Sequence, residues 1–539
     1  TSTPAEPVSA PAEKELLPVT VLSGFLGAGK TTLLKKILRN PATITDPVTK
    51  KTRTRKIAVI VNDMGEVNLD ASEIKASKLI EEDAQMVELH NGCICCTLRG
   101  DLLRTVKSLA DEGAYDYLVI ESSGISEPLP VAQTFVMDVE EPEGGGEEGG
   151  EGEEEPKEKK PKSQQTTPAT EAYKSLSNFA RLDTLCTVVD ATAIYDVLDT
   201  VEELSDPNNM SGMGASGDDD ERPISRLLLD QIEFANVIIL SKAQDVISTT
   251  NGATRVKEMT MLLKKLNPLA RVVVSKKAGY ADVDTEEHLI NTGMFDMEKA
   301  ESLEAWIEEL ELGNQHTPET EEYGISGFVF RARRPFHPAR IHAIYRAFGD
   351  LSGAVDMRNT SLEAKKKKTT RSRAAPAAKS SRAATPPPPS DLDVFRGVVR
   401  SKGKLWLANA MSYPFAVHSA GRNMTIEPDD MPFLAAVEPE EWDEDDLMAH
   451  RTMKKEGKWG TEFGDRESEI ILIGVNSDKA KMTKMLEAAL VTKEEHKELG
   501  GVEGYRGLED PFFDGECATE FFDVKENAEE DEEEEEEEE

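Results

Sequence analysis

One stretch near the start of the chain constrains the fold more than any other. Residues 24–31 read Gly-Phe-Leu-Gly-Ala-Gly-Lys-Thr and match the pattern G-x-x-x-x-G-K-[ST] in full. Residues 19–22 predict a short buried strand, and residues 32–38 have the apolar spacing of a helix. A glycine-rich turn between a strand and a helix lets backbone N–H groups point at a phosphate. The sequence therefore predicts a phosphate-binding loop.

Side chains at the end of this loop complete the predicted nucleotide site. Lys30 adds a positive charge toward the β- and γ-phosphates, which makes it a candidate catalytic residue. The hydroxyl of Thr31 is the expected protein ligand for Mg²⁺. The residues of this segment that we expect to bind the nucleotide are Gly24, Gly27, Ala28, Gly29, Lys30, Thr31 and Thr32.

Strand and helix patterns alternate along the first part of the chain. This alternation is typical of an α/β domain with a mostly parallel sheet, in which ligands bind at the carboxyl edge of the strands. We expect a P-loop NTPase domain over residues 18–310, with a loop at 40–56. The runs that predict strands are 57–61, 117–121, 182–190, 237–240 and 271–275, and the patterns that predict helices include 227–234 and 256–266.

The predicted strand at residues 117–121 delivers a carboxylate to that edge. Glu121 closes the strand, and Gly124 follows three residues later. In P-loop proteins such a carboxylate holds the hydration shell of Mg²⁺, and such a glycine N–H can turn onto the γ-phosphate. Glu121 is therefore the second candidate catalytic residue, and Gly124 is a further candidate nucleotide contact. A nucleotide-sensing switch is expected at residues 62–70.

Three cysteines crowd into four positions between a predicted strand and a predicted helix. Cys93, Cys95 and Cys96 can meet one Zn²⁺ at about 2.3 Å and leave one tetrahedral corner open, as transfer of the ion requires. His90 is a candidate fourth ligand, which would make the site closed and structural. Redox switching of the thiols is the other functional alternative.

The segment that would select the nucleotide base is irregular. P-loop GTPases recognise guanine through N-K-x-D after a strand, where the Asp carboxylate accepts from guanine N1–H and N2–H. Here residues 241–245 read Ser-Lys-Ala-Gln-Asp, so Ser replaces Asn and the Asp arrives one residue late. Lys242 and Asp245 are the expected base contacts. Because Gln244 stands in the strict Asp position, the choice between GTP and ATP stays open, with GTP favoured.

The composition argues against two broad classes of function. Lys and Arg number 63 against 103 Asp and Glu, a formal net charge of −40, whereas a nucleic-acid binder needs a basic face. No apolar run is long enough to span a bilayer. Five cysteines in 539 residues fit a reducing compartment. We expect a cytoplasmic protein that binds neither nucleic acid nor membranes; the basic run at residues 365–373 leaves nuclear import open.

A second, smaller α+β domain is predicted over residues 324–490. Of its scattered histidines, His337 is the best candidate for a ligand or a client contact. We expect disorder in the arm at residues 1–17 and in the acidic insert at about 140–170. A basic and Pro-rich insert at about 363–391 interrupts the second domain, and an acidic tail occupies residues 491–539. The patterns behind the domain are strands at 325–331 and 470–474, helices at 338–348 and 478–490, and a hairpin formed by 394–400 and 404–408.

Several of these motifs occur together in one known family. They are residues 23–33, 65–67, 91–99, 121–128, 266–268 and 291–296 in the first domain, and 334–338 and 464–466 in the second. With them the chain resembles the CobW-like family of metal-handling P-loop GTPases, which is related to the hydrogenase and urease nickel-insertion GTPases. The resemblance covers most of the chain that we expect to be ordered and implies a CobW-type C-terminal domain.

The resemblance implies a GTPase that binds Zn²⁺ at the three cysteines and passes it to a client apo-metalloenzyme. GTP, Mg²⁺ and Zn²⁺ are the implied cofactors. In some relatives the client is a methionine aminopeptidase, and others serve cobalt or nitrile hydratase maturation. Two further classes stay open: a redox- or metal-sensing regulatory GTPase, and a scaffold whose function resides in the charged inserts. The sequence does not specify the oligomeric state.

Overall fold

The computed structural model divides into two compact units. The first consists of Thr1–Ser23, Thr31–Leu185 and Thr285–Met297, and the second of Gly24–Lys30, Cys186–Asp284 and Glu298–Glu539. The residues that the structure describes are 16–39, 41–45, 50–62, 86–89, 99–136, 176–204, 222–301, 325–348, 391–460, 462–475, 478–513 and 517–523.

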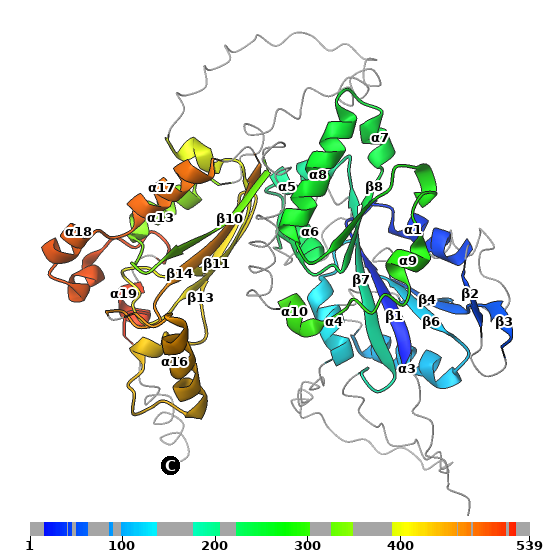
Figure 1. Cartoon of the computed structure of the whole chain (residues 1–539), viewed down its shortest axis with the longest axis horizontal. Coiled ribbons are helices and arrows are strands. Elements are labelled where there is room, and N and C mark those ends of the chain that lie inside the picture. Colours follow the sequence, from blue (N-terminus) through cyan, green and yellow to red (C-terminus); the bar gives the residue numbers. More distant parts are fainter. Residues whose placement is uncertain are drawn as a thin grey trace, which may run out of the picture. The chain divides into compact units, whose positions relative to one another are not determined.

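The first unit contributes four neighbouring strands to a seven-stranded sheet, whose order is β5-β4-β6-β1-β7-β8-β9 (Figure 1). Strand β4 lies between β5 and β6, and both of its neighbours run parallel to it. Strand β1 also pairs in parallel with β6. The bounds are Leu17–Ser23 for β1, Ile57–Asn62 for β4, Met86–Leu89 for β5 and Tyr117–Glu121 for β6.

Apolar sequence explains why these segments form central strands. All five residues of β6 are buried, and so are the apolar residues of β4. A parallel strand covered on both faces needs a continuous apolar run rather than an alternating one. In α1 the buried residues Leu33, Leu34 and Ile37 form the helical stripe that packs inward. The helices of this unit include α1 (Lys30–Arg39), α3 (Arg99–Glu112), α4 (Pro128–Val136) and α9 (Thr285–Leu289).

The second unit begins its part of the sheet with the end of strand β7. Strands β7, β8 and β9 pair in parallel, so the predicted α/β fold with a mostly parallel sheet is confirmed. Helices α7 and α8 pack against each other, and α6 packs against α8 (Figure 1). The strand bounds are Ala180–Asp190, Val237–Ser241 and Arg271–Val274 for β7 to β9, and the helices α5 to α8 span Ile194–Asp199, Ile224–Glu233, Ala243–Ile247 and Gly252–Leu266.

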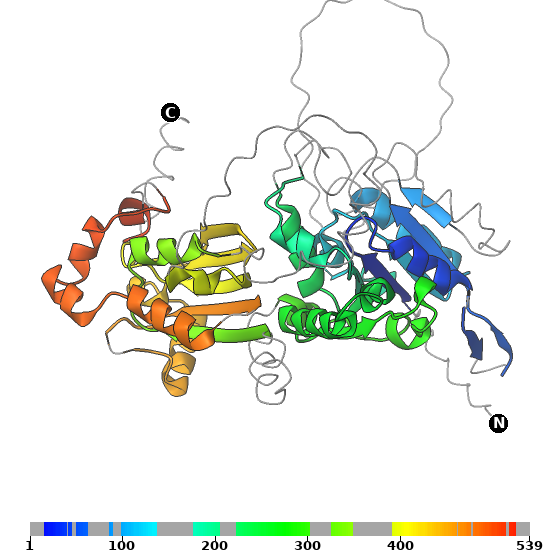
Figure 2. The same ribbon diagram turned by 90° about the horizontal axis from the view of Figure 1, so that it is seen from above.

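The C-terminal part of the second unit is built on a separate antiparallel sheet, which confirms the predicted α+β class. Its order is β10-β14-β11-β12-β13. Helices α13 (Pro338–Tyr345) and α17 (Lys479–Ala489) lie side by side over one face of this sheet and share its apolar core (Figure 2). Strands β10 to β14 span Ile325–Ala332, Val398–Leu405, Phe415–Ala420, Asn423–Pro428 and Ser468–Val475.

The hairpin that we predicted from residues 394–400 and 404–408 is wrong. The structure has one continuous strand, β11, which pairs with β12 on one side and β14 on the other. The apparent turn is misleading because Gly403 has a positive φ of 147°, and a Cβ there would lie 2.0 Å from the carbonyl oxygen of Glu469. This glycine permits a close approach of two strands and does not end one.

The loop predicted at residues 40–56 is wrong in part. It contains a short antiparallel hairpin of β2 (Thr43–Thr45) and β3 (Thr52–Thr54). Its residues are mostly exposed, so the sequence carries no alternating apolar signal. The β-branched threonines favour the extended backbone without one.

Folded elements continue beyond residue 490, where we expected the acidic tail to begin. Helix α18 (Lys493–Glu498) and α19 (Cys517–Glu520) follow, and Tyr505, Cys517 and Phe522 are buried. The charged inserts at 140–170 and 363–390, and the residues after 523, lie outside the described residues. Among the helices that the structure does describe, none is both long enough and apolar enough to cross a bilayer.

Candidate functional site

The glycine-rich turn after β1 adopts a backbone that other residues cannot easily take. Gly24, Gly27 and Gly29 all have positive φ angles. A Cβ on Gly24 would lie 2.3 Å from the carbonyl oxygen of Val188 in β7, and one on Gly29 would lie 2.5 Å from the hydroxyl of Tyr280. The same tyrosine hydroxyl donates to the carbonyl of Gly29 at 3.0 Å. The loop is therefore held tightly against its surroundings.

This packing predicts that Gly24→Ala is more harmful than the same change at Gly27. At Gly27 a Cβ would meet nothing within 4 Å, so alanine there incurs only the strain of a positive φ. At Gly24 alanine incurs the same strain, and its Cβ also clashes with the backbone of Val188. We expect Gly24→Ala to lower the free energy of unfolding by about 3 kcal/mol and Gly27→Ala by about 1 kcal/mol. Denaturant unfolding measures both, and equal losses would contradict the packing argument.

Lys30 is the first residue of α1, and its side chain folds back over the loop. Its Nζ donates to the carbonyl oxygen of Gly24 at 2.7 Å and lies 3.4 Å from that of Phe25. The residue is only 7% exposed, so its charge acts in surroundings of low dielectric constant. A buried ammonium beside the N-terminus of a helix favours an anion such as a phosphate.

Thr31 and Glu121 come together in the first unit. The Thr31 hydroxyl donates to Oε1 of Glu121 at 2.8 Å, and Glu121 is 1% exposed at the end of β6. The backbone N–H and hydroxyl of Ser122 both donate to the carbonyl of Leu22 at 3.0 Å, which fixes the end of β6 beside β1. A hydroxyl and a carboxylate are hard oxygen ligands, the kind that Mg²⁺ prefers. Gly124 is buried in the turn that follows, and Thr32 is exposed.

The segment after β8 is tied to the glycine-rich loop. The hydroxyl of Ser241 donates to the carbonyl oxygen of Ala28 at 2.7 Å and to that of Val189 at 3.1 Å. The next residue, Lys242, has a positive φ of 52°, and its Nζ lies 2.6 Å from Oδ2 of Asp190. Serine at the position of the expected asparagine thus still bonds to the loop.

Helix α7 begins directly after Lys242 and contains both residues that are candidates for contact with the nucleotide base, Gln244 and Asp245. Asp245 is exposed, whereas Gln244 is half-buried. The Oε1 atom of Gln244 is buried and has no hydrogen-bond partner within the part of the chain that the structure describes. The amide Nε2 of Gln244 lies 3.5 Å from Oδ2 of Asp245, so the two side chains approach each other at the start of the helix.

Two residues of this site were not found by sequence reasoning. Asp190 ends a predicted strand, but only its ion pair with Lys242 shows that it orders the segment after β8. Tyr280 lies in no recognisable motif, because its contact with Gly29 joins residues 251 positions apart.

The comparisons with known proteins agree with this architecture. The family model described as "CobW/HypB/UreG, nucleotide-binding domain" matches residues 18–144 and 160–274, and "Cobalamin synthesis protein cobW C-terminal domain" matches residues 390–490. The zinc-regulated GTPase metalloprotein activator 1 of Dictyostelium discoideum is 36% identical over 471 residues, which cover 86% of this chain and 77% of that protein.

The chain belongs to the CobW family of P-loop GTPases. Shorter matches include the zinc chaperone CobW of Pseudomonas aeruginosa, 42% identical over 124 residues that cover 22% of this chain and 30% of that protein. The zinc-regulated GTPase metalloprotein activator 1 of Schizosaccharomyces pombe is 39% identical over 127 residues, 23% of this chain and 28% of that protein.

In this CobW-family chain the three clustered cysteines, Cys93, Cys95 and Cys96, lie outside the described residues, as do His90 and residues 63–70 of the expected switch. The elements around Cys93, Cys95 and Cys96 are described: β5 ends at Leu89 and α3 begins at Arg99. Elsewhere in the described ranges, no three His, Cys, Asp or Glu side chains form a group that could hold a metal ion.

His337 is the candidate ligand or client contact of the C-terminal domain. It precedes α13, and burial together with the nearby Arg340 charge lowers its pKa, so the imidazole is neutral at pH 7. A neutral imidazole is able to bind a metal ion. Within the described residues, His337 does not belong to any group of three His, Cys, Asp or Glu side chains that could hold a metal ion.

Proposed function

We propose that this P-loop GTPase is a zinc chaperone that binds Zn²⁺ at Cys93, Cys95 and Cys96 and passes it to a client metalloenzyme. The names of its relatives, zinc-regulated GTPase metalloprotein activator and zinc chaperone, support a role in metal delivery. The strands that precede the cysteine segment and the proposed nucleotide-sensing loops end at the same edge of the sheet, and this observation carries the proposal.

The strand registers give the spacing of the strand ends from which these segments leave. Val61 of β4 is level with Glu88 of β5 on one side and with Glu121 of β6 on the other. Parallel strands lie about 4.8 Å apart, so the ends of β5 and β6 are about 10 Å apart with β4 between them. The cysteine segment follows the end of β5 and the proposed switch follows the end of β4. A change at the nucleotide thus has a short path to the metal.

The residues that we propose to hold GTP are Gly24, Gly27, Ala28, Gly29, Lys30, Thr31 and Thr32 of the glycine-rich segment and Gly124 after β6. Lys30 supplies a charge for the β- and γ-phosphates. Thr31 and Glu121 offer oxygen atoms that fit Mg²⁺, which when bound neutralises charge on the phosphates. No arginine finger or general base stands out among the described residues near the loop, and we expect slow intrinsic turnover.

The coupling of zinc to nucleotide is tested by measuring zinc affinity in two nucleotide states. We expect the affinity with a non-hydrolysable GTP analogue to exceed that with GDP by about tenfold, a typical coupling energy between sites. A competing chelator that reports free zinc provides the measurement. Equal affinities would remove the proposed link between hydrolysis and release, while leaving zinc binding itself intact.

Base selection rests on Lys242 together with Asp245 or Gln244. A carboxylate can accept from both N1–H and N2–H of guanine, whereas the amide of Gln244 can accept from only one of them. We expect Gln244→Asp to raise the preference for GTP over ATP by about tenfold, as one added base contact allows. Competition of each nucleotide against a fluorescent GDP analogue measures this ratio. If Asp245→Asn lowers GTP affinity and Gln244→Asp has no effect, Asp245 reads the base instead.

A methionine aminopeptidase, the client class that the resemblance implies, is the first to test. A pull-down under zinc limitation compares the unaltered chain with Cys95→Ser, and a metalloenzyme retained by the unaltered chain alone supports delivery. Mass spectrometry of the native protein separates this function from redox sensing, which predicts oxidised thiols and no bound zinc.

A further inference from the structure

Cationic side chains line a pocket of about 500 Å³ in the C-terminal part of the second unit. The pocket is walled by the chain just after β10, by the segment before β14 and by α18. Phe463 and Tyr505 give it an aromatic surface. We call it the basic pocket and define it by Arg333, Arg334, Arg466, Lys493 and Lys497, which oppose a single carboxylate on its wall, Glu462.

Most of these positive charges have no carboxylate partner in the described chain. Arg466 donates to the backbone carbonyls of Met411, Phe463 and Ala435, and Arg334 donates to that of Val491. Neither guanidinium forms an ion pair with a described residue. Carbonyl groups satisfy donors without neutralising the positive charge, and Asp465 attracts Arg466 without forming an ion pair with it.

The two lysines of α18 resemble these arginines in having no ion pair within the described chain. Lys493 and Lys497 are exposed, four residues apart, and no described carboxylate pairs with either. Of the five cations, Arg333 alone forms an ion pair within the described residues, with Glu467 at 3.4 Å. Four unpaired cations around one pocket, in a chain whose net charge is −40, indicate a site for an anionic ligand.

We propose that the basic pocket binds the acidic segment at residues 526–539 of this chain. Twelve of its fourteen residues are Asp or Glu. The described chain reaches Asp523, three positions before this segment, and Asp523 lines a second pocket of about 550 Å³. The two pockets share Glu462, Phe463, Arg466 and His496. An extended chain spans about 3.5 Å per residue, so the segment has ample reach.

Tethering makes this contact effective even where each charge pair is weak. A short flexible connection gives the attached segment an effective concentration in the millimolar range. The segment would therefore occupy the pocket at low ionic strength and release it as salt screens the charges. An acidic segment of a partner protein would have to displace it.

The test uses a fluorescent synthetic peptide of residues 526–539 and measures its anisotropy as protein is added. The acceptor is the full-length chain in which the acidic residues of 526–539 are changed to their amides. We expect saturable binding that weakens with added NaCl, and at least about tenfold weaker binding to the unaltered chain, whose own segment competes. Lys493→Glu with Lys497→Glu in the amide-substituted chain should reduce binding by about tenfold or more.

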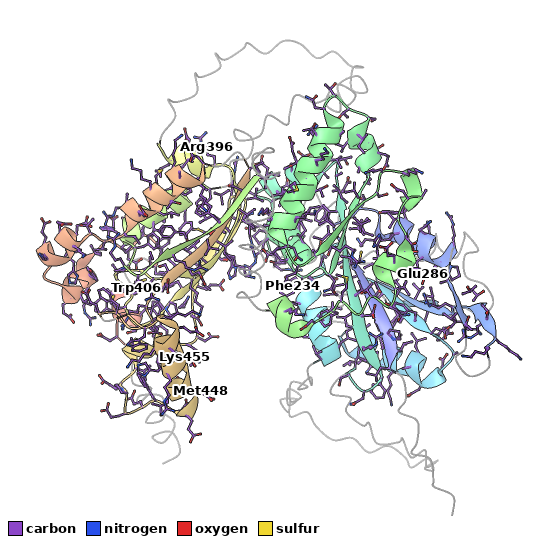
Figure 3. The ribbon with its side chains drawn as sticks, viewed as in Figure 1. Phe234, Glu286, Arg396, Trp406, Met448 and Lys455 are labelled. Atoms are coloured by element: carbon purple, nitrogen blue, oxygen red, sulfur yellow. The ribbon has the colours of Figure 1, made fainter. Side chains whose placement is uncertain are left out.

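Lys454→Glu with Lys455→Glu is the matched control, because both lysines lie on the exposed helix α16 (Glu444–Glu456) and line neither pocket. Figure 3 labels Lys455 on this helix. Thermal unfolding of each variant shows whether it is folded, and Lys493→Gln with Lys497→Gln gives a neutral second pair. Equal loss in the control, equal binding by the unaltered chain, or binding of an RNA oligonucleotide in place of the peptide would each overturn the proposal. The readout needs neither nucleotide nor zinc, so it is independent of the proposed chaperone function.

Discussion

Lys30→Ala is expected to lower the rate of GTP hydrolysis by about 10²- to 10³-fold, the usual loss when one preorganised donor to a developing charge is removed. The lysine is 7% exposed and is aimed along the loop by its bond to the Gly24 carbonyl. Alanine removes the charge and leaves that carbonyl without this donor. Single-turnover hydrolysis of GTP measures the chemical step apart from product release.

Lys36→Ala is the control, since Lys36 lies on the same helix, α1, but not in the loop. Its turnover should match that of the unaltered chain. Unchanged hydrolysis in Lys30→Ala would show that the loop does not act as a catalytic phosphate site. That result would favour the scaffold alternative, in which the nucleotide domain no longer hydrolyses GTP.

Replacing Cys93, Cys95 and Cys96 together by serine is expected to abolish tight zinc binding, from about one equivalent to none. Thiolates are the donors that zinc prefers, and a serine hydroxyl stays protonated at neutral pH and binds the ion weakly. Native mass spectrometry and a chelator competition assay both report the bound ion. GTP binding should be retained, because the loop residues are untouched.

The other two cysteines provide an internal control. Cys186 and Cys517 are buried, and burial raises the pKa of both thiols, which keeps them protonated. A protonated thiol is a poor metal ligand. Cys186→Ala and Cys517→Ala should therefore keep full zinc binding. Loss of zinc in these variants with the three-cysteine motif intact would place the metal elsewhere.

The central strands of the parallel sheet were predictable because each depends on its own composition. In β8, residues 237–240 are all apolar, the pattern of a parallel strand that is covered on both faces. The hairpin assigned around residue 403 failed for the opposite reason. The sequence shows a glycine but not the neighbouring backbone of Glu469 that requires it. Short exposed strands such as Thr43–Thr45 give no burial signal at all.

The phosphate loop was predictable for a similar reason, because all of its parts are contiguous in sequence. The residues that hold it in place are not. Tyr280 reaches Gly29, and Ser241 reaches Ala28, across more than 200 positions. The serine could be located from its strand, yet its bond to the loop follows only from the fold. The aromatic residues that extend the C-terminal core to Phe522 were hidden by the acidic residues around them.

Strand β7 aligns two loops at once. Its residue Val188 lies against Gly24, and Asp190, two positions later, pairs with Lys242. Insertion or deletion of one residue in this strand would turn Asp190 to the opposite face and strip Lys242 of its counter-charge. The same event would present a different backbone unit to the glycine turn. Tolerance to length change should therefore be lowest here, and a scan of single-residue deletions would locate that intolerance.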